Sequence, residues 1–249
     1  MSGHSKWATT KYRKGAQDAA RSKRTVKHIR SLEVAAREGG GDINNNAALR
    51  TAYERARSDS VPMDTIERAI KRGTGDLEGV RYEAVSYEGY ASGGVAVLVE
   101  TLTDNRNRTA AELRNLFNRN GGSLAEPGAV SWQFERKGVV ELERSLDEDA
   151  IMEVAADAGA EDVNDVGERW QVVSAATDLA AVRSALEAAG MTPTSAELTM
   201  IPTTTVEIAE SEEAQRVLRL LDAIDDHDDV QVVHANYDIP ESVLAGYAG

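Results

Sequence analysis

The spacing of apolar side chains predicts that the chain begins with helices. Over about residues 16–38, apolar positions recur at three- and four-residue steps, with Val26, Ile29 and Ala36 on one face, which is typical of an amphipathic helix. Glycines at 39–41 favour its end, because glycine adopts the left-handed conformation of a helix C-terminus. Shorter amphipathic helices are predicted over about 46–58 and from Pro62 onwards, so the first part of the chain makes a small helical bundle.

From residue 83 the pattern changes to strands that alternate with helices. The first group is predicted to contain a helix and three strands, at 108–120 and at 83–90, 95–102 and 130–135. Residues 139–200 then follow the order strand, helix, strand, strand, helix, strand, which is the ferredoxin-like arrangement. A last strand–helix–strand unit over 204–235 is too small to stand alone, so we expect it to complete the sheet begun at 83–135.

These elements predict a multi-domain protein with α and α+β parts. The polar, glycine-rich stretch 72–79 follows a helix and lacks the lysine of a phosphate-binding loop, so it is interpreted as a linker. The expected domains are a basic three-helix bundle, an α+β domain and a ferredoxin-like α+β domain inserted into it, over 1–76, 77–136 plus 203–249, and 137–202.

Composition excludes several classes of protein. The chain has 249 residues and no cysteine, so we expect no disulfide, no thiolate metal site and no cysteine nucleophile. The first residues are polar and basic with no apolar run behind them, which argues against a signal peptide. The longest apolar stretch, near 94–99, is much shorter than the about 20 residues of a membrane-spanning helix. We therefore expect a soluble, cytoplasmic protein that does not bind membranes.

Charge is distributed unevenly, although the formal net charge of the whole chain is −14. Residues 1–72 hold 16 Lys and Arg against 8 Asp and Glu, whereas residues 138–249 hold 5 against 25. The segment between them, 73–137, holds 7 against 9. The molecule is therefore an electrostatic dipole, and its N-terminal part is the part suited to a polyanion.

Basic charge is densest in residues 1–30, which carry nine basic side chains and a single acid. On the predicted helix, Lys23, Lys27 and Arg30 share one face. Ahead of it, cations alternate with aromatic rings, which can stack on bases while the cations contact phosphates, although Trp7 can equally pack on the bundle. The predicted nucleic-acid-binding residues are Lys6, Trp7, Lys11, Tyr12, Arg13, Lys14, Arg21, Lys23, Arg24, Lys27, Arg30, Lys71 and Arg72.

A second candidate site is the polar segment that precedes the helix predicted at 108–120. Two arginines beside a helix N-terminus can hold a phosphate or a carboxylate. The alternative is that the segment makes a turn and its arginines bind acidic neighbours. Both interpretations stay open, and the candidate anion-binding residues are Asn105, Arg106, Asn107 and Arg108.

Signals for catalysis or metal binding are weak. The four histidines lie far apart, and no metalloprotease, serine-hydrolase, nucleotide-loop or calcium-loop motif occurs. The run Asp-Asp-His-Asp-Asp at 225–229 is interpreted as a solvated connection between a helix and a strand, because consecutive loop residues rarely converge on one ion. We expect no catalytic residue, no metal, no cofactor and no small-molecule ligand.

Several longer segments resemble one known family over nearly the whole chain. They include GHSKWATTKYRK (3–14), VAAREGGGD (34–42), YEGYASGGVAVLVETLTDNRNRT (87–109) and LLDAIDDHDDVQVV (220–233). These segments resemble the YebC/PmpR family, for which the GHSKW start and TDNRNRT are highly specific. The resemblance implies a non-enzymatic regulator of gene expression with a helical N-terminal domain and two α+β domains, one ferredoxin-like and inserted in the other.

The resemblance implies two roles. One is a DNA-binding transcriptional regulator, and the other is a ribosome-associated translation factor that binds ribosomal or transfer RNA and relieves stalling, for example at proline runs. Both would use the basic N-terminal domain, so the expected partner is DNA or ribosomal RNA. A remote third interpretation is an enzyme that binds an anionic substrate at Arg106 and Arg108, for which no nucleophile or base stands at a suitable spacing.

Overall fold

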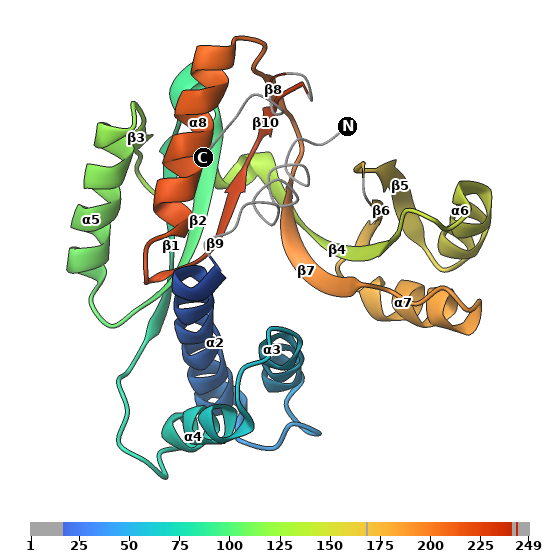
Figure 1. The fold of residues 1–249 in the computed structure, drawn as a ribbon, viewed down its shortest axis with the longest axis horizontal. Helices are drawn as coiled ribbons and strands as arrows, with labels where there is room; N and C mark the ends of the chain where they lie inside the picture. Colours follow the sequence, from blue (N-terminus) through green and yellow to red (C-terminus); the bar gives the residue numbers. More distant parts are fainter. Residues whose placement is uncertain (1–16, 168, 241–242, 244–249) are drawn as a thin grey trace.

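A computed structural model describes residues 17–167, 169–240 and 243 (Figure 1). Its chain contains a helical bundle and two four-stranded antiparallel sheets that carry helices. The predicted fold class, a mixture of α and α+β parts, is confirmed. Within the described residues, no helix is both long and apolar enough to cross a membrane.

The three predicted N-terminal helices are confirmed. They are α2 (Gln17–Gly39), α3 (Ala47–Ser58) and α4 (Met63–Thr74). Leu32, Leu49 and Ile66, one from each helix, are fully buried in a common core. Asn46 connects the first two helices, because its side chain accepts the Leu49 N–H and donates to the Ala35 carbonyl oxygen. This capping satisfies backbone groups that the helix ends would otherwise leave unpaired.

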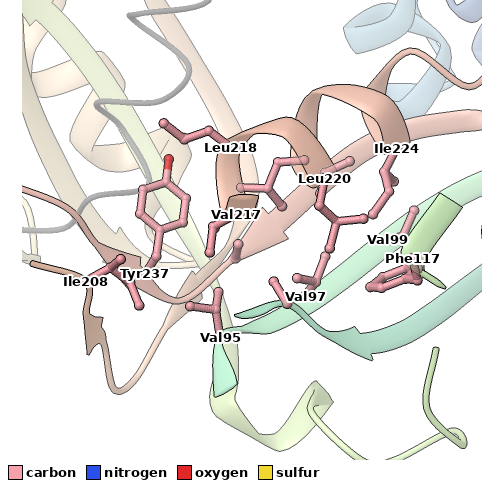
Figure 2. Packing of buried hydrophobic residues seen from close by; sticks show 14 of the residues in the cluster. Val95, Val97, Val99, Phe117, Ile208, Val217, Leu218, Leu220, Ile224 and Tyr237 are labelled. Carbon is pink, nitrogen blue, oxygen red and sulfur yellow. The ribbon is translucent and has the colours of Figure 1, made fainter. Parts of the chain in front are cut away.

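The first sheet has the strand order β3-β1-β2-β9, and helices α5 and α8 pack on one of its faces. Its elements are β1 (Glu83–Tyr90), β2 (Ala96–Thr103), α5 (Arg106–Arg119), β3 (Ser123–Leu124), α8 (Ser211–Asp225) and β9 (Val230–Ala235), with a short 3-10 turn, η1, at Ser92–Gly94. Figure 2 shows Val217 and Leu220 of α8 over Val97 of β2. Since β9 pairs with β2, the last unit does complete the sheet begun at residue 83, as predicted.

The second sheet confirms the ferredoxin-like arrangement. In chain order its elements are β4 (Phe134–Glu143), α6 (Glu148–Asp157), β5 (Ala160–Asp165), β6 (Arg169–Ala175), α7 (Leu179–Ala188) and β7 (Ser195–Pro202). The strand order is β5-β6-β4-β7, with all neighbours antiparallel. Trp170 lies at the centre of its core, 1% exposed, beneath both helices.

The strand predicted at 130–135 is wrong. Residues Ser131–Gln133 form a 3-10 turn, η2, and one continuous strand, β4, begins at Phe134. The loop before β4 is held by the buried Glu88 carboxylate, which accepts the N–H groups of Gly128, Val130 and Ser131 at 2.6–2.8 Å. A backbone that donates three successive bonds to one side chain cannot also donate them to a neighbouring strand.

Two other strand boundaries also differ. Gly138 suggests a strand end, yet it lies inside β4, where a Cβ atom would stand 2.7 Å from Leu179 Cβ; the glycine allows α7 to pack closely. In the segment predicted at 204–208, only Val206–Glu207 (β8) forms a strand, and it pairs in parallel with β10 (Tyr237–Asp238) outside the four-stranded sheets.

The described hydrophobic residues gather in separate clusters for the bundle, the first sheet and the second sheet. The second sheet lies in the sequence between β3 and β9 of the first. We propose that these clusters mark the three predicted domains, at 1–76, 77–136 plus 203–249, and 137–202.

Replacing Gly73 by alanine should destabilise the bundle. A Cβ atom there would stand 2.5 Å from the Glu33 carbonyl oxygen and 2.7 Å from Ala36 Cβ, so α4 would have to move away from α2. Overpacking of this kind costs about 1–3 kcal/mol. Urea unfolding, with the exposed Glu67→Ala on the same helix as the control, measures the loss. A Gly73→Ala protein as stable as the control would contradict the close α2–α4 contact.

Candidate nucleic-acid interface

The basic face of α2 meets the acidic turn that connects α8 to β9. We call residues 225–229 the aspartate turn. Lys23, Lys27 and Arg30 lie on one side of α2 and bind, in this order, the carboxylates of Asp226 at 3.5 Å, Asp225 at 3.4 Å and Asp229 at 2.7 Å, so that helix and turn run side by side. Figure 1 shows the N-terminal end of α2 beside the lower end of α8.

The same cations also bind backbone oxygens where α8 ends. Lys27 Nζ donates to the Asp225 carbonyl oxygen at 2.7 Å, and Lys23 Nζ donates to that of Asp226 at 3.3 Å. Helix α8 has no basic residue of its own in its last turn, where the helix dipole is negative and carbonyl groups lack partners. The cations of α2 therefore neutralise the C-terminal end of α8 from outside.

Burial increases along this contact. The Lys23 and Asp226 side chains are 45% and 68% exposed, those of Lys27 and Asp225 are 17% and 19% exposed, and those of Arg30 and Asp229 are 13% and 2% exposed. Exposed ion pairs contribute about 0–1 kcal/mol, whereas removing one partner of a buried pair costs several kcal/mol. The contact is thus weak at Lys23 and strong at Arg30.

Asp229 is the centre of the strong end. Besides Arg30, its carboxylate accepts hydrogen bonds from Arg108 Nη2 and from Thr109 Oγ1, both at 2.7 Å, and a longer one from Thr103 Oγ1 at 3.3 Å. These side chains come from α2, from α5 and from the end of β2. One carboxylate thus joins the bundle to the first sheet.

This environment determines the protonation of Asp229. Burial by itself would raise its pKa, but the hydrogen bonds from Arg108 and Thr109 and the charge of Arg30 outweigh burial and lower the pKa below the usual value for a carboxyl group. The same hydrogen bond to Asp229, despite some burial, raises the pKa of Arg108, and Asp104 adds to this. All three groups are therefore charged at neutral pH.

The candidate anion-binding segment is engaged with carboxylates. Asn105 is the N-cap of α5, where its side chain accepts the Arg108 N–H at 3.1 Å. Arg106 pairs with Glu83 at 2.7 Å, and Arg108 pairs with Asp104 and Asp229. Asn107 is exposed in the first turn. This geometry matches the interpretation as a turn whose arginines bind acidic neighbours, and an anion site there stays a prediction.

The other predicted contact residues are spread over the bundle. Arg24 is partly exposed on α2, Arg21 lies in the same helix, and Lys71 is exposed on α4. Arg72 Nε donates to Glu33, a nearly buried carboxylate, at 2.5 Å. The rest, Lys6, Trp7, Lys11, Tyr12, Arg13 and Lys14, lie outside the described residues.

One group of described side chains, Glu112, His227 and Asp229, has metal-ligand spacing. His227 Nδ1 accepts the Asp229 N–H at 3.1 Å, which leaves the ring proton on Nε2, 2.8 Å from the Glu112 carboxylate. The Asp229 carboxylate is occupied by two arginines and Thr109. The lone pairs that a metal would need are taken, so this group does not fit a metal site as it stands.

Sequence reasoning missed the aspartate turn as part of the site. Its residues were interpreted as solvated, yet Asp229 is 2% exposed. The available signal was the pairing of opposite charges: a basic face on one helix and an acidic run at the end of another, in a chain whose ends carry opposite net charge.

Two family models match this chain. The one described as "TACO1/YebC protein N-terminal domain" covers residues 5–76, and the one described as "TACO1/YebC second and third domain" covers residues 82–237. The chain belongs to the TACO1/YebC family. This membership confirms the resemblance seen in the sequence.

Relatives in this family are similar over almost their whole length. A protein from Beutenbergia cavernae is 54% identical over 248 residues, 98% of each chain, and one from Thermotoga maritima is 54% identical over 246 residues, 98% of this chain and 96% of its own. Both are named "Probable transcriptional regulatory protein". The crystal structure of a conserved hypothetical protein from Aquifex aeolicus has a TM-score of 0.82 and 45% identity, covering 91% of this chain and 94% of that one.

Replacing Asp229 by asparagine should destabilise the protein by about 3 kcal/mol at neutral pH, because Arg30 and Arg108 would lose their common charged partner. Since the pKa of Asp229 is lowered on folding, its contribution is fully present above the unfolded value of about 3.9 and is lost as the pH falls through the lower folded value. Urea unfolding over this pH range measures the difference.

The exposed Glu153→Gln on α6 is the control for the loss of one charge. The gap between native protein and Asp229→Asn should stay constant from about pH 7 to pH 5 and shrink below about pH 4. A gap that does not change with pH, or no gap at all, would contradict the buried ionised carboxylate.

Proposed function

We propose that this protein is a non-enzymatic, nucleic-acid-binding regulator of gene expression. The observation that carries the proposal is the basic face of α2, where Lys23, Lys27 and Arg30 hold a row of carboxylate and carbonyl oxygens. A surface that binds successive anionic oxygens can bind successive phosphates, which present similar acceptors along a backbone. The net charge of +8 in residues 1–72 adds a long-range attraction.

The transcriptional role is the first candidate. The relatives from Beutenbergia cavernae and Thermotoga maritima both carry the name "Probable transcriptional regulatory protein", which supports DNA as the partner. Phosphate contacts give affinity without sequence specificity. The net charge of −20 in residues 138–249 would repel a duplex that lay along the whole molecule, so DNA would contact the basic N-terminal end.

A translational role is the second candidate, and the charge distribution favours it. A ribosome offers RNA phosphates beside basic proteins, which would suit a molecule with one basic and one strongly acidic end. In this reading the basic domain, with Lys6, Lys11, Arg13, Lys14 and the cations of α2, would contact ribosomal RNA. The acidic domains would face solvent or basic protein.

Neutralising the basic N-terminal segment should weaken nucleic-acid binding. The triple variant Lys11→Gln, Arg13→Gln, Lys14→Gln should bind a short labelled RNA or duplex DNA about tenfold or more weakly, and its salt dependence should fall by about 0.7–0.9 log units per lost phosphate contact. Fluorescence anisotropy over a range of salt concentrations measures both.

The matched control removes three exposed charges from α5 and α8, in the variant Arg114→Gln, Arg119→Gln, Arg216→Gln. It should bind nearly as well as the native protein. Equal weakening in both triple variants would mean that net charge alone attracts the polyanion, and salt-insensitive binding would contradict phosphate contacts altogether.

Sedimentation of a cell lysate through sucrose separates the two candidate roles. Native protein that runs with ribosomes, while the Lys11, Arg13, Lys14 variant stays at the top, would support the translational role. If both stay at the top while the native protein retards duplex DNA with sequence preference, the transcriptional role is supported.

A further inference from the structure

We infer that the aspartate turn competes with nucleic acid for the basic face of α2, and that a polyanion reaches this face by displacing Asp225 and Asp226. The inference rests on the proposed function and concerns the regulation of the same surface. In the structure, Lys23 and Lys27 already hold a carboxylate and a backbone oxygen each. A phosphate would have to take the place of these groups.

The turn presents anionic oxygens in the way a polyanion does. Asp225 is the last residue of α8 and Asp226 is its C-cap, so both carboxylates stand beside the negative end of the helix dipole. Their carbonyl oxygens point to the same lysines as their carboxylates. Outside α2, the last turn of α8 has no basic side chain of its own to balance this charge.

The burial gradient shows which part of the contact can open. The Lys23–Asp226 pair is largely exposed, and the Lys27–Asp225 pair is partly buried. Exposed pairs exchange readily with other ions in solution. The outer two pairs are therefore the ones that a phosphate backbone can replace.

The inner pair keeps the two parts together while the outer pairs exchange. Arg30 binds Asp229, donates to the Asp228 and Leu102 carbonyl oxygens, and stacks over the Tyr82 ring at 5.1 Å. Asp229 is also held by Arg108. We assign Arg30 and Asp229 the role of a pivot, about which the bundle can move away from Asp225 and Asp226 without separating from the first sheet.

This arrangement lowers the affinity for every polyanion by the same factor, because the closed contact must open first. It therefore favours ligands that offer several phosphates at once. A short or isolated anion would gain too little from Lys23 and Lys27 to replace two carboxylates.

The test compares two charge-matched variants of the full chain. Asp225→Asn with Asp226→Asn removes the outer competitors, and Glu153→Gln with Asp157→Asn removes two exposed carboxylates from α6. Fluorescence anisotropy with labelled oligouridine at fixed salt gives the affinities. We expect the turn variant to bind about five- to tenfold more tightly than native protein and the α6 variant to bind within about twofold of it.

Hydrogen exchange of the native protein provides a second measurement. The amides of Asp226 and His227 donate to carbonyl groups of α8 at 2.9 and 3.0 Å, and they should exchange faster when oligouridine is added. Slower or unchanged exchange, or equal affinities of the two variants and the native protein, would overturn the inference while leaving the proposed function in place. Absence of oligouridine and duplex DNA binding in every variant would instead overturn the proposed function, and the inference with it.

Discussion

The pairing of one buried carboxylate with two arginines holds this molecule together across its parts. Asp229 follows α8, Arg30 belongs to the N-terminal bundle, and Arg108 belongs to α5 on the first sheet. A buried charge must be paired, so these side chains cannot separate without exposing or isolating it. The position of α2 against the sheet follows from this requirement, since the contact is made mainly by ion pairs and hydrogen bonds.

The opposite charges of the two ends have two consequences in one contact. They attract α2 to the end of α8, and they keep a nucleic-acid-binding surface partly occupied by the protein itself. Structural ion pairs and ligand-binding cations are the same residues at Lys23 and Lys27. A basic helix in a sequence therefore does not identify a free surface, because an acidic segment 200 residues away can bind it first.

Much of the fold could be predicted from local patterns. The helices of the bundle and the order of the ferredoxin-like unit follow from apolar periodicity, which reflects burial on one face of each element. The predictions that failed concern residues whose partners are distant in the sequence. Glu88 holds the loop before β4 through three backbone bonds, and Gly138 continues a strand because α7 packs against it. Local sequence at 130–138 carries no sign of either neighbour.

By itself the sequence determined the family, the helical and α+β parts and the separation of charge between the two ends, because composition and periodicity are properties of the chain alone. The tertiary structure decided which charges meet. It placed Arg106 and Arg108 against carboxylates and brought the aspartate turn to the basic face of α2. Electrostatic partners are chosen by distance and burial, and these exist only when the chain is folded.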